Sequence, residues 1–450
     1  MGTRGGGGAG FRAVVTGGLA PDGGLWMPES WPQFTRDEIA AMAGLDYPET
    51  AARVLARFVG DEIDGATLRG LCADAYAGFD DRAVTPLRQL DERLHLLELF
   101  HGPTLSFKDI ALQLLGAMLG HFGSRTTIIG ATSGDTGSAA IHAVAGRTGV
   151  RIVMLYPEGR ISDVQRRQMT SVAADNVDVV AIDGSFDDCQ RIVKAVLGDA
   201  ALVVRHRLSA VNSINWLRIA AQSVYYFHAA VSLGAPGRAV SFAVPTGNLG
   251  DAFAGHAARR MRLPIDRIIV ATNANDIVAR ALTTSVYRPG VATATDAPAM
   301  DIQVASNFER LLWDAGGGDA ALAARQMAAL VDEGAIVLTD PQRAALGHMT
   351  GVAIDAAAMD AAMRWAFERG ATIDPHTAIA LAAAQRGDRD LPTVVLATAH
   401  PAKFPDAVQR ATGRAPAVPA RLAAALTGPE RVTRLPADVA AVAAYVAARG

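Results

Sequence analysis

Only three lysines occur in this chain of 450 residues, at Lys108, Lys194 and Lys403, and every other strong base is arginine. The difference matters because lysine can lose its proton and attack a carbonyl group, whereas arginine stays protonated and cannot form an imine. A lysine that is retained in such a chain is therefore a candidate nucleophile. The alternative for each position is an exposed surface amine.

Lys108 lies in the segment LFHGPTLSFKD, which is followed by an apolar helical stretch. The Gly-Pro pair predicts a turn. We expect Thr104 or Ser106 to cap the helix, and Asp109 in its first turn suits the helix dipole. Lys108 would then lie at a helix start, where the positive helix end disfavours the ammonium and favours a neutral amine that can form an imine.

A run of small polar residues extends from Thr132 to Ser138, between a predicted strand and an Ala-rich predicted helix. Backbone N–H groups at a helix N-terminus, together with the hydroxyls of Thr132, Ser133 and Thr136, form a pocket for an anion such as a substrate carboxylate. A capped turn would explain one Ser or Thr, but not an unbroken run.

A second strand–loop–helix stretch, VSFAVPTGNLGD, ends at Asp251. Gly247 and Gly250 allow the backbone to approach a phosphate closely at the start of the next helix. The stretch lacks the Gly-Lys-Ser/Thr of a Walker loop and does not match the dinucleotide fingerprint. We therefore expect a single phosphate, such as that of a cofactor, with an ordinary tight turn as the alternative.

Thr398 follows an apolar run at 393–397, so it is expected at the carboxyl end of a strand. A neutral hydroxyl there could hydrogen-bond to a pyridine nitrogen without protonating it. Taken alone, His400 and Lys403 fit packing and solvated positions better than catalytic ones. The histidines show no spacing typical of a metal site, so no metal is expected.

Short β-branched runs alternate with Ala-rich helical stretches from about residue 125 onward. This alternation is typical of βαβ units and mostly parallel sheets, in which ligands bind at the carboxyl ends of strands. The expected strands are 126–129, 151–156, 177–182, 240–244, 267–271 and 393–397, and the expected helices are 36–43, 48–58, 138–146, 185–197, 252–261 and 277–282.

The composition makes several other classes of protein improbable. The net charge is −3 without a basic stripe, so no nucleic acid partner is expected. No apolar run reaches the roughly 18 residues of a membrane helix, so no membrane partner is expected, and the N-terminus lacks the apolar region of a secretory signal. Two cysteines cannot build a disulfide framework or a cysteine zinc site, which favours a cytoplasmic location.

Taken together, several long stretches resemble the threonine synthase family, which belongs to the fold-type-II, or tryptophan-synthase-β-like, pyridoxal-phosphate (PLP) enzymes. The resemblance covers most of the chain. The stretches are GLAPDGGLWMPES, LFHGPTLSFKD, GATSGDTGSAA, NSINWLRI, PTGNLGD, ATNANDIV, MDIQVASNFERLL, DPHTA and ATAHPAKFPDA.

The resemblance implies an α/β fold with two open, twisted, mostly parallel sheets and flanking helices, plus an N-terminal extension at 1–92. A smaller α/β domain, at 93–225, would carry the lysine segment and the loop for the substrate carboxylate. A larger α/β domain, at 226–450, would carry the loop for the cofactor phosphate.

The resemblance also implies roles for individual residues. Lys108 is the Schiff-base lysine and the catalytic group, and Thr398 faces the pyridine nitrogen of PLP. Leu249 stands where relatives often have Phe and should act through its backbone. The residues implied for the cofactor phosphate are Gly247, Asn248, Leu249, Gly250 and Asp251; those for the substrate carboxylate are Thr132, Ser133, Asp135 and Thr136; those for the substrate phosphate are Arg160 and Ser162.

The implied activity converts O-phospho-L-homoserine and water into L-threonine and phosphate, in a monomer or homodimer. A related PLP phospholyase, or a sulfonate-forming relative acting on another phosphorylated amino acid, would share Lys108 and the phosphate loop. A PLP-binding protein without turnover is a third possibility. The lysine, the carboxylate loop and the phosphate loop together argue against it.

Overall fold

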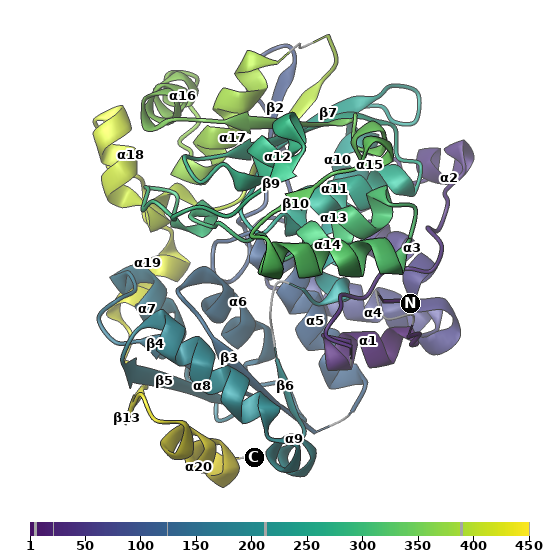
Figure 1. Cartoon of the computed structure of the whole chain (residues 1–450). Helices are drawn as coiled ribbons and strands as arrows, with labels where there is room; N and C mark the ends of the chain where they lie inside the picture. The colour runs from purple at the N-terminus through teal and green to yellow at the C-terminus, as the bar shows by residue number, and fades with distance from the viewer. Residues whose placement is uncertain (4–6, 21, 124, 211–213, 388–389, 450) are drawn as a thin grey trace.

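The computed structural model describes residues 1–450 except 4–6, 21, 124, 211–213, 388–389 and 450. Two mostly parallel sheets, each covered by helices, form the two halves of the molecule (Figure 1). A long N-terminal segment packs along the helices beside them. The α/β class with two such sheets is the one that the sequence predicts.

The larger sheet has the strand order β1-β2-β12-β7-β8-β11. Every neighbouring pair is parallel except β1 and β2. All residues of β7 and β12 are buried, as expected for a parallel sheet covered on both faces. The strands are β1 (Leu87–Gln89), β2 (Leu94–Glu98), β7 (Val240–Pro245), β8 (Ile265–Thr272), β11 (Met349–Ala353) and β12 (Thr393–Ala397).

Alternate residues of this sheet pack into two separate cores. Phe242 and Val244 pack with α10 (Trp216–Ser232) and α11 (Gly250–Arg260). Ala243 faces the other way, toward α16 (Ala356–Glu368), α17 (Pro375–Arg386) and α18 (Pro405–Thr412). The side chains therefore follow the period of two of a strand.

The smaller sheet has the order β13-β5-β4-β3-β6, and all its pairs are parallel. One face packs on α8 (Phe186–Gly198) and α20 (Val439–Arg449). The other faces α6 (Asp135–Val144), which packs in turn on α5 (Lys108–His121). The strands are β3 (Thr126–Ala131), β4 (Val150–Pro157), β5 (Val177–Asp183), β6 (Leu208–Ala210) and β13 (Thr433–Pro436).

All the strands and helices expected from the sequence are present. The strand at 393–397 has the expected ends, and the others have at least one shifted end. The division of the chain at residues 92 and 225 stays a prediction. Three strand pairs cross these boundaries: β1 with β2, β2 with β12, and β5 with β13. β2 lies in the six-stranded sheet, and β13 returns from the C-terminal part of the chain to the five-stranded sheet.

The N-terminal segment contains α1 (Phe11–Gly17), α2 (Arg36–Ala40), α3 (Tyr47–Val59) and α4 (Gly65–Tyr76). Thr35, Asp46 and Asp64 cap the last three helices by accepting from backbone N–H groups. α3 packs on α10, and α4 packs on α5. This segment therefore supports the helices between the two sheets.

The remaining two strands are short. β9 (Val286–Tyr287) and β10 (Ile336–Val337) form an antiparallel pair. None of the helices in the described ranges is long and apolar enough to cross a membrane. The other helices are α7 (Asp163–Thr170), α9 (Ala200–His206), α12 (Ile277–Thr284), α13 (Phe308–Ala315), α14 (Ala320–Asp332), α15 (Asp340–Ala345), α19 (Ala420–Thr427) and the 3₁₀ helices η1 (Gly60–Glu62), η2 (Pro298–Met300) and η3 (Pro401–Lys403).

Arg310 on α13 joins the N-terminal segment to the core. Its side chain is fully buried; Nε donates to the Trp26 carbonyl at 3.2 Å and Nη2 to the Ile214 carbonyl at 2.6 Å. Nη1 donates to the side chain of Asn307. Burial lowers the pKa of Arg310 to about 9, so the guanidinium remains charged at neutral pH.

Replacing Arg310 by Ala should lower the free energy of unfolding by about 3 kcal/mol, because buried carbonyls lose their donors and a cavity remains. Urea unfolding followed by circular dichroism measures the change. Arg325→Ala, at an exposed position on α14, is the control and should change stability by less than about 0.5 kcal/mol. Equal effects of the two substitutions would contradict this account of Arg310.

Candidate functional site

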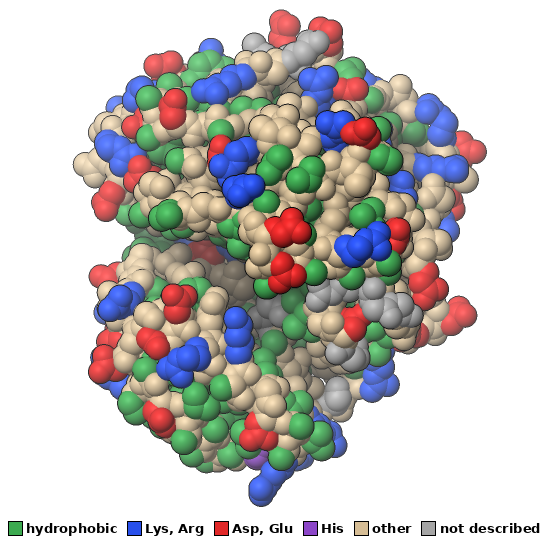
Figure 2. Space-filling view, viewed as in Figure 1, with side chains coloured by type: hydrophobic (Ala, Val, Ile, Leu, Met, Phe, Trp, Pro, Cys, Tyr) green, Lys and Arg blue, Asp and Glu red, His purple; other side chains and the backbone are tan. Residues whose placement is uncertain are grey.

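A cavity of about 770 Å³, counted with its open mouth, lies where the ends of several elements meet. Figure 2 shows that the surface is hollowed between the two halves of the molecule. The cavity is at the carboxyl ends of β7 and β12 and at the starts of α5, α6 and α11. Its lining residues are Ser106, Phe107, Lys108, Asp135, Thr136, Arg218, Gln222, Pro245, Thr246, Gly247, Asn248, Leu249, Gly250, Asp251, Ala252, Ala299, Met300, His376, Thr398 and Ala399.

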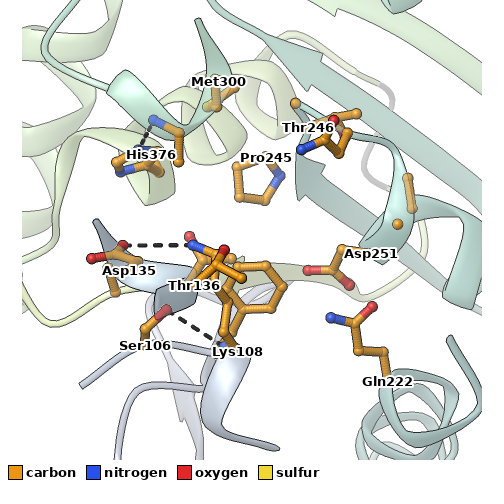
Figure 3. A pocket seen from close by; sticks show the side chains of 18 of the residues that line it. Ser106, Lys108, Asp135, Thr136, Gln222, Pro245, Thr246, Asp251, Met300 and His376 are labelled. Atoms are coloured by element: carbon orange, nitrogen blue, oxygen red, sulfur yellow. Dashed lines mark hydrogen bonds and ion pairs between the residues drawn. The ribbon is translucent and has the colours of Figure 1, made fainter. Parts of the chain in front are cut away.

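Most of the residues singled out from the sequence line this cavity. They are Lys108, Asp135, Thr136, Gly247, Asn248, Leu249, Gly250, Asp251 and Thr398. Figure 3 shows Lys108, Asp135 and Thr136 on one side, with Pro245 and Thr246 opposite them. Segments far apart in the sequence are thus brought to one place.

Four of the predicted residues do not line the cavity: Thr132, Ser133, Arg160 and Ser162. Ser133, Arg160 and Ser162 are exposed, and the Ser162 hydroxyl caps α7 by accepting from Gln165 N at 3.2 Å. Their roles toward a substrate stay predictions, and the geometry adds no support for them.

Lys108 is the first residue of α5, as the sequence predicts. The residue before the helix is Phe107, whose side chain caps nothing, and the predicted cap Ser106 contributes one long hydrogen bond, in which its hydroxyl accepts from Lys108 N at 3.5 Å. Thr104 instead donates to Asp109, from its backbone N at 2.8 Å and its hydroxyl at 2.7 Å. Burial raises the pKa of Asp109 to about 6, although the bonds from Thr104 oppose the rise.

Asp135 lies between two lysines. Its Oδ2 is 3.6 Å from the Lys108 Nζ, and its Oδ1 is 2.8 Å from the Lys403 Nζ. Gln165 donates to the same Oδ1 at 3.1 Å. Burial alone would raise the pKa of Asp135, but the two lysines, Lys403 before Lys108, hold it well below its usual range.

The sequence predicts a packing or solvated position for Lys403, and the structure shows a buried one. Its side chain is 1% exposed, and its Nζ also donates to the Thr104 carbonyl at 3.0 Å. The scarcity of lysine was the available signal, but the apolar and Pro residues around position 403 gave no indication of a partner 268 positions away along the chain.

The amine of Lys108 is buried among charged groups. Burial lowers its pKa, Asp135 raises it, and the positive charges of Lys403 and Arg218 lower it further. The net direction is downward, so the neutral amine is more accessible than in an ordinary lysine. The prediction of a lowered pKa is confirmed in direction, with desolvation as the leading cause.

The loop before α6 is shaped by Thr132. Its Oγ1 accepts from the N–H groups of Gly134 and Gly137, both at 3.0 Å. A Cβ on Gly137 would lie 2.3 Å from the Thr132 side chain, and one on Gly134 would lie 2.3 Å from Gln165. The Thr132 hydroxyl therefore holds the loop, and the glycines permit its close packing.

The loop before α11 presents free backbone donors. None of the N–H groups of residues 247–250 donates to a carbonyl in the described chain. The left-handed residue is Leu249, with φ of 62°, and not a glycine. Gly247 is required for another reason, because a Cβ there would lie 2.5 Å from the Ala299 carbonyl.

Asp251 follows this loop in the first turn of α11. Its Oδ1 accepts from the hydroxyls of Tyr225 and Tyr226, while its Oδ2 is buried without a partner among the described residues. Burial raises the pKa of Asp251 to about 7, although both tyrosine bonds lower it. The carboxyl group is thus partly neutral near neutral pH.

Arg218 on α10 is a site residue that the sequence reading missed. Its side chain is buried, and its Nε and Nη1 have no partner in the described parts of the chain. Burial lowers its pKa to about 10, so it stays cationic. Its stretch, NSINWLRI, carried the resemblance, but Asn212 and Ser213 in it lie outside the described residues.

Thr398 directly follows β12, as the sequence predicts. Its carbonyl accepts from Phe107 N at 2.9 Å, which ties the end of β12 to the residue before Lys108. His376 lies nearby; its Nδ1 is 2.7 Å from Asp374, and its Nε2 accepts from Ala299 N at 3.3 Å. These bonds define a neutral His376 that donates to Asp374.

The donor set fits a cofactor that carries one phosphate and one aldehyde. Free N–H groups at the start of α11 suit a phosphate. The Lys108 amine faces the same cavity and is the one nucleophile along its lining that can form an imine. The unpartnered Arg218 leaves a further anion site beyond the cofactor phosphate.

Three family models match successive parts of the chain, and the last two matches overlap at residues 377–398. "Threonine synthase N terminus" matches residues 1–76, "Pyridoxal-phosphate dependent enzyme" matches residues 80–398, and "Threonine synthase, C-terminal" matches residues 377–446.

Known proteins are similar over nearly the whole length. The threonine synthase of Pseudomonas aeruginosa is 47% identical, over 98% of this chain and 96% of its own. A PLP-bound threonine synthase structure from Brucella melitensis is 46% identical with a TM-score of 0.96, covering 100% of this chain and 98% of its own. The yeast threonine synthase structure is 35% identical with a TM-score of 0.93, covering 98% and 96%.

The matched models, the full-length relatives and a cavity whose donors fit the cofactor agree: the chain belongs to the threonine synthase family of fold-type-II, PLP-dependent enzymes.

Proposed function

We propose that this chain converts O-phospho-L-homoserine and water into L-threonine and phosphate. The observation that carries the proposal is one cavity that joins a lysine amine, a loop of free N–H groups and an unpartnered arginine. A phosphorylated amino-acid substrate brings two anionic groups in addition to the cofactor phosphate. The named relatives support the same reaction.

The cofactor would be held at three places. The N–H groups of residues 247–250 and the start of α11 would bind its phosphate, Lys108 would hold its aldehyde carbon, and the Thr398 hydroxyl would face its ring nitrogen. When bound, PLP supplies an electron sink that stabilises negative charge at the substrate Cα. This neutral hydroxyl would hydrogen-bond to the ring nitrogen without protonating it.

Lys108 would carry protons during the reaction. Once the substrate amino group has taken its place, the freed Nζ can accept the proton from the substrate Cα and later return it. Repeated transfer requires an amine with a lowered pKa, and the burial of Lys108 provides this. The Asp135 carboxylate, 3.6 Å away, can hold the ammonium between the two transfers.

The substrate anions would bind on either side of this amine. The loop at 132–137, with Thr136 facing the cavity, would bind the α-carboxylate. Arg218 would bind the phosphate, because its guanidinium is the unpartnered cation in the lining. Burial between the two sheets excludes water from these charge pairs and strengthens them.

We also propose a cytoplasmic location and a monomeric or homodimeric state. Both cysteines, Cys72 and Cys189, are buried free thiols, which suits a reducing compartment. Light scattering of the purified protein measures the oligomeric state.

Lys108→Ala should abolish turnover and the visible absorption of covalently bound cofactor, because no other amine lines the cavity. Lys194→Ala, at an exposed position of α8, is the matched control and should keep both. The assay measures threonine and phosphate together. Release of phosphate with a keto acid would instead identify a phospholyase, and turnover by Lys108→Ala would exclude the assigned role of this lysine.

Arg218→Met should raise KM for O-phosphohomoserine at least about tenfold, since a charge-assisted bond to phosphate is worth roughly 1.5–3 kcal/mol. The cofactor content should stay unchanged. Arg218→Lys keeps the charge and should lose less. Loss of cofactor with an unchanged KM would reassign Arg218 to the cofactor phosphate.

The ionisation of Asp251 should weaken the binding of PLP as the pH rises through about 7. Below that value the Asp251 carboxyl is mostly neutral, and above it the carboxylate repels the cofactor phosphate from the same cavity. Asp251→Asn should remove this part of the pH dependence, as measured by cofactor titration of the stripped protein at pH 6 and pH 8.

Asp187→Asn, at an exposed position of α8, is the control. Its affinity for PLP at pH 6 and at pH 8 should equal that of the original protein. The same ratio of affinities at the two pH values in Asp251→Asn and in the original protein would count against repulsion by Asp251.

A further inference from the structure

Lys403 is a buried cation, and it has no role in the reaction proposed above. It does not line the cavity. It reaches the site from η3, just after β12, and contacts Oδ1 of Asp135, whereas Lys108 lies near Oδ2. Burying a lysine costs free energy, because its charge must be removed from water. A buried lysine therefore calls for an explanation.

The two lysines are held unequally. The Lys403 Nζ has two close acceptors, the Asp135 carboxylate at 2.8 Å and the Thr104 carbonyl at 3.0 Å. The Lys108 Nζ has one carboxylate oxygen at 3.6 Å. An ammonium is more stable where short bonds replace its hydration, so the cluster holds its positive charge on Lys403.

Other charged groups face Lys108 from neighbouring helices. Arg218 on α10 adds a second positive charge that opposes an ammonium at Lys108. Asp251 on α11 lines the same cavity, and its pKa is raised to about 7 by burial. The carboxylate of Asp109, next in sequence to Lys108, accepts hydrogen bonds from the backbone N–H and the hydroxyl of Thr104. His376 on α17 is neutral, since it donates to Asp374 and accepts from a backbone N–H.

The balance between the neutral amine and the ammonium of Lys108 therefore depends on the charge of one carboxylate. Asp135 is the carboxylate that contacts Lys108, and Lys403 neutralises it from the other side. Without Lys403, the full charge of Asp135 would favour an ammonium at Lys108. An ammonium has no lone pair and cannot act as a nucleophile.

We propose that Lys403 is a positioning residue that pairs with Asp135 so that Lys108 meets its carbonyl partner as a neutral amine. The proposal rests on the proposed function, in which Lys108 is the attachment lysine. It predicts opposite effects of removing the two partners: loss of Lys403 favours protonated Lys108, and loss of the Asp135 charge favours neutral Lys108.

Competitive acetylation of the cofactor-stripped, full-length protein tests the proposal. Acetic anhydride reacts with neutral amines, and peptide mass spectrometry separates the three lysines. The exposed Lys194 serves as an internal reference in every sample. The pH midpoint of acetylation is recorded for Lys108 in the original protein and in Lys403→Gln, Lys403→Arg and Asp135→Asn.

Lys403→Gln should raise the midpoint of Lys108 by about one pH unit or more, which is about tenfold less neutral amine at a pH below the midpoint. Lys403→Arg keeps the charge and should leave the midpoint within about half a unit of the original. Asp135→Asn should lower the midpoint. If Lys403→Gln does not fold, Asp135→Asn still tests the sign.

An unchanged or lowered midpoint in Lys403→Gln would overturn the proposal, as would a raised midpoint in Asp135→Asn. A purely structural role for Lys403 and Asp135 would expose Lys108 to water and raise its midpoint in Asp135→Asn as well as in Lys403→Gln, and this outcome also counts against the proposal. The labelling does not depend on product formation. Failure to form threonine would therefore refute the proposed function without affecting the midpoint measurement.

Discussion

The shared carboxylate of Asp135 is the interaction on which the site depends. It lies 2.8 Å from one buried ammonium and 3.6 Å from the amine at the start of α5. A carboxylate buried this deeply is stable only when cations compensate it. Its two partners come from segments almost three hundred residues apart. The cluster therefore forms only when folding brings these segments together.

The topology of the larger sheet explains how those segments meet. β2 and β12 are parallel neighbours, with Leu94 opposite Thr393 and Glu98 opposite Ala397. The chain therefore leaves both strands at the same edge. The segment after β2 leads to Lys108, and the segment after β12 leads through Thr398 to Lys403. The hydrogen bond from Phe107 N to the Thr398 carbonyl joins the segment after β2 to the segment after β12.

Local sequence patterns predict the type and place of a helix, strand or loop. They predict less well which side chains of distant elements contact one another. The β-branched runs predict the strands, and the loop at 247–251 is recognisable because its glycines and the helix after it are contiguous. Lys403 and Arg218 were missed because their burial depends on packing between distant segments. Thr104, one of the two predicted caps of α5, instead donates its hydroxyl and its backbone N–H to the Asp109 carboxylate.

One electrostatic field serves two purposes in this cavity. The start of α11, Arg218 and Lys403 all place positive potential around it, which suits a ligand with several anionic groups. The same potential opposes a proton on Lys108, which the proposed chemistry requires. A free carboxylate would work against both purposes. The two acids at the cavity are accordingly restrained: Asp135 is shared between lysines, and Asp251 has a pKa raised to about 7 by burial. Binding of anions and activation of the amine thus depend on the same arrangement of charge.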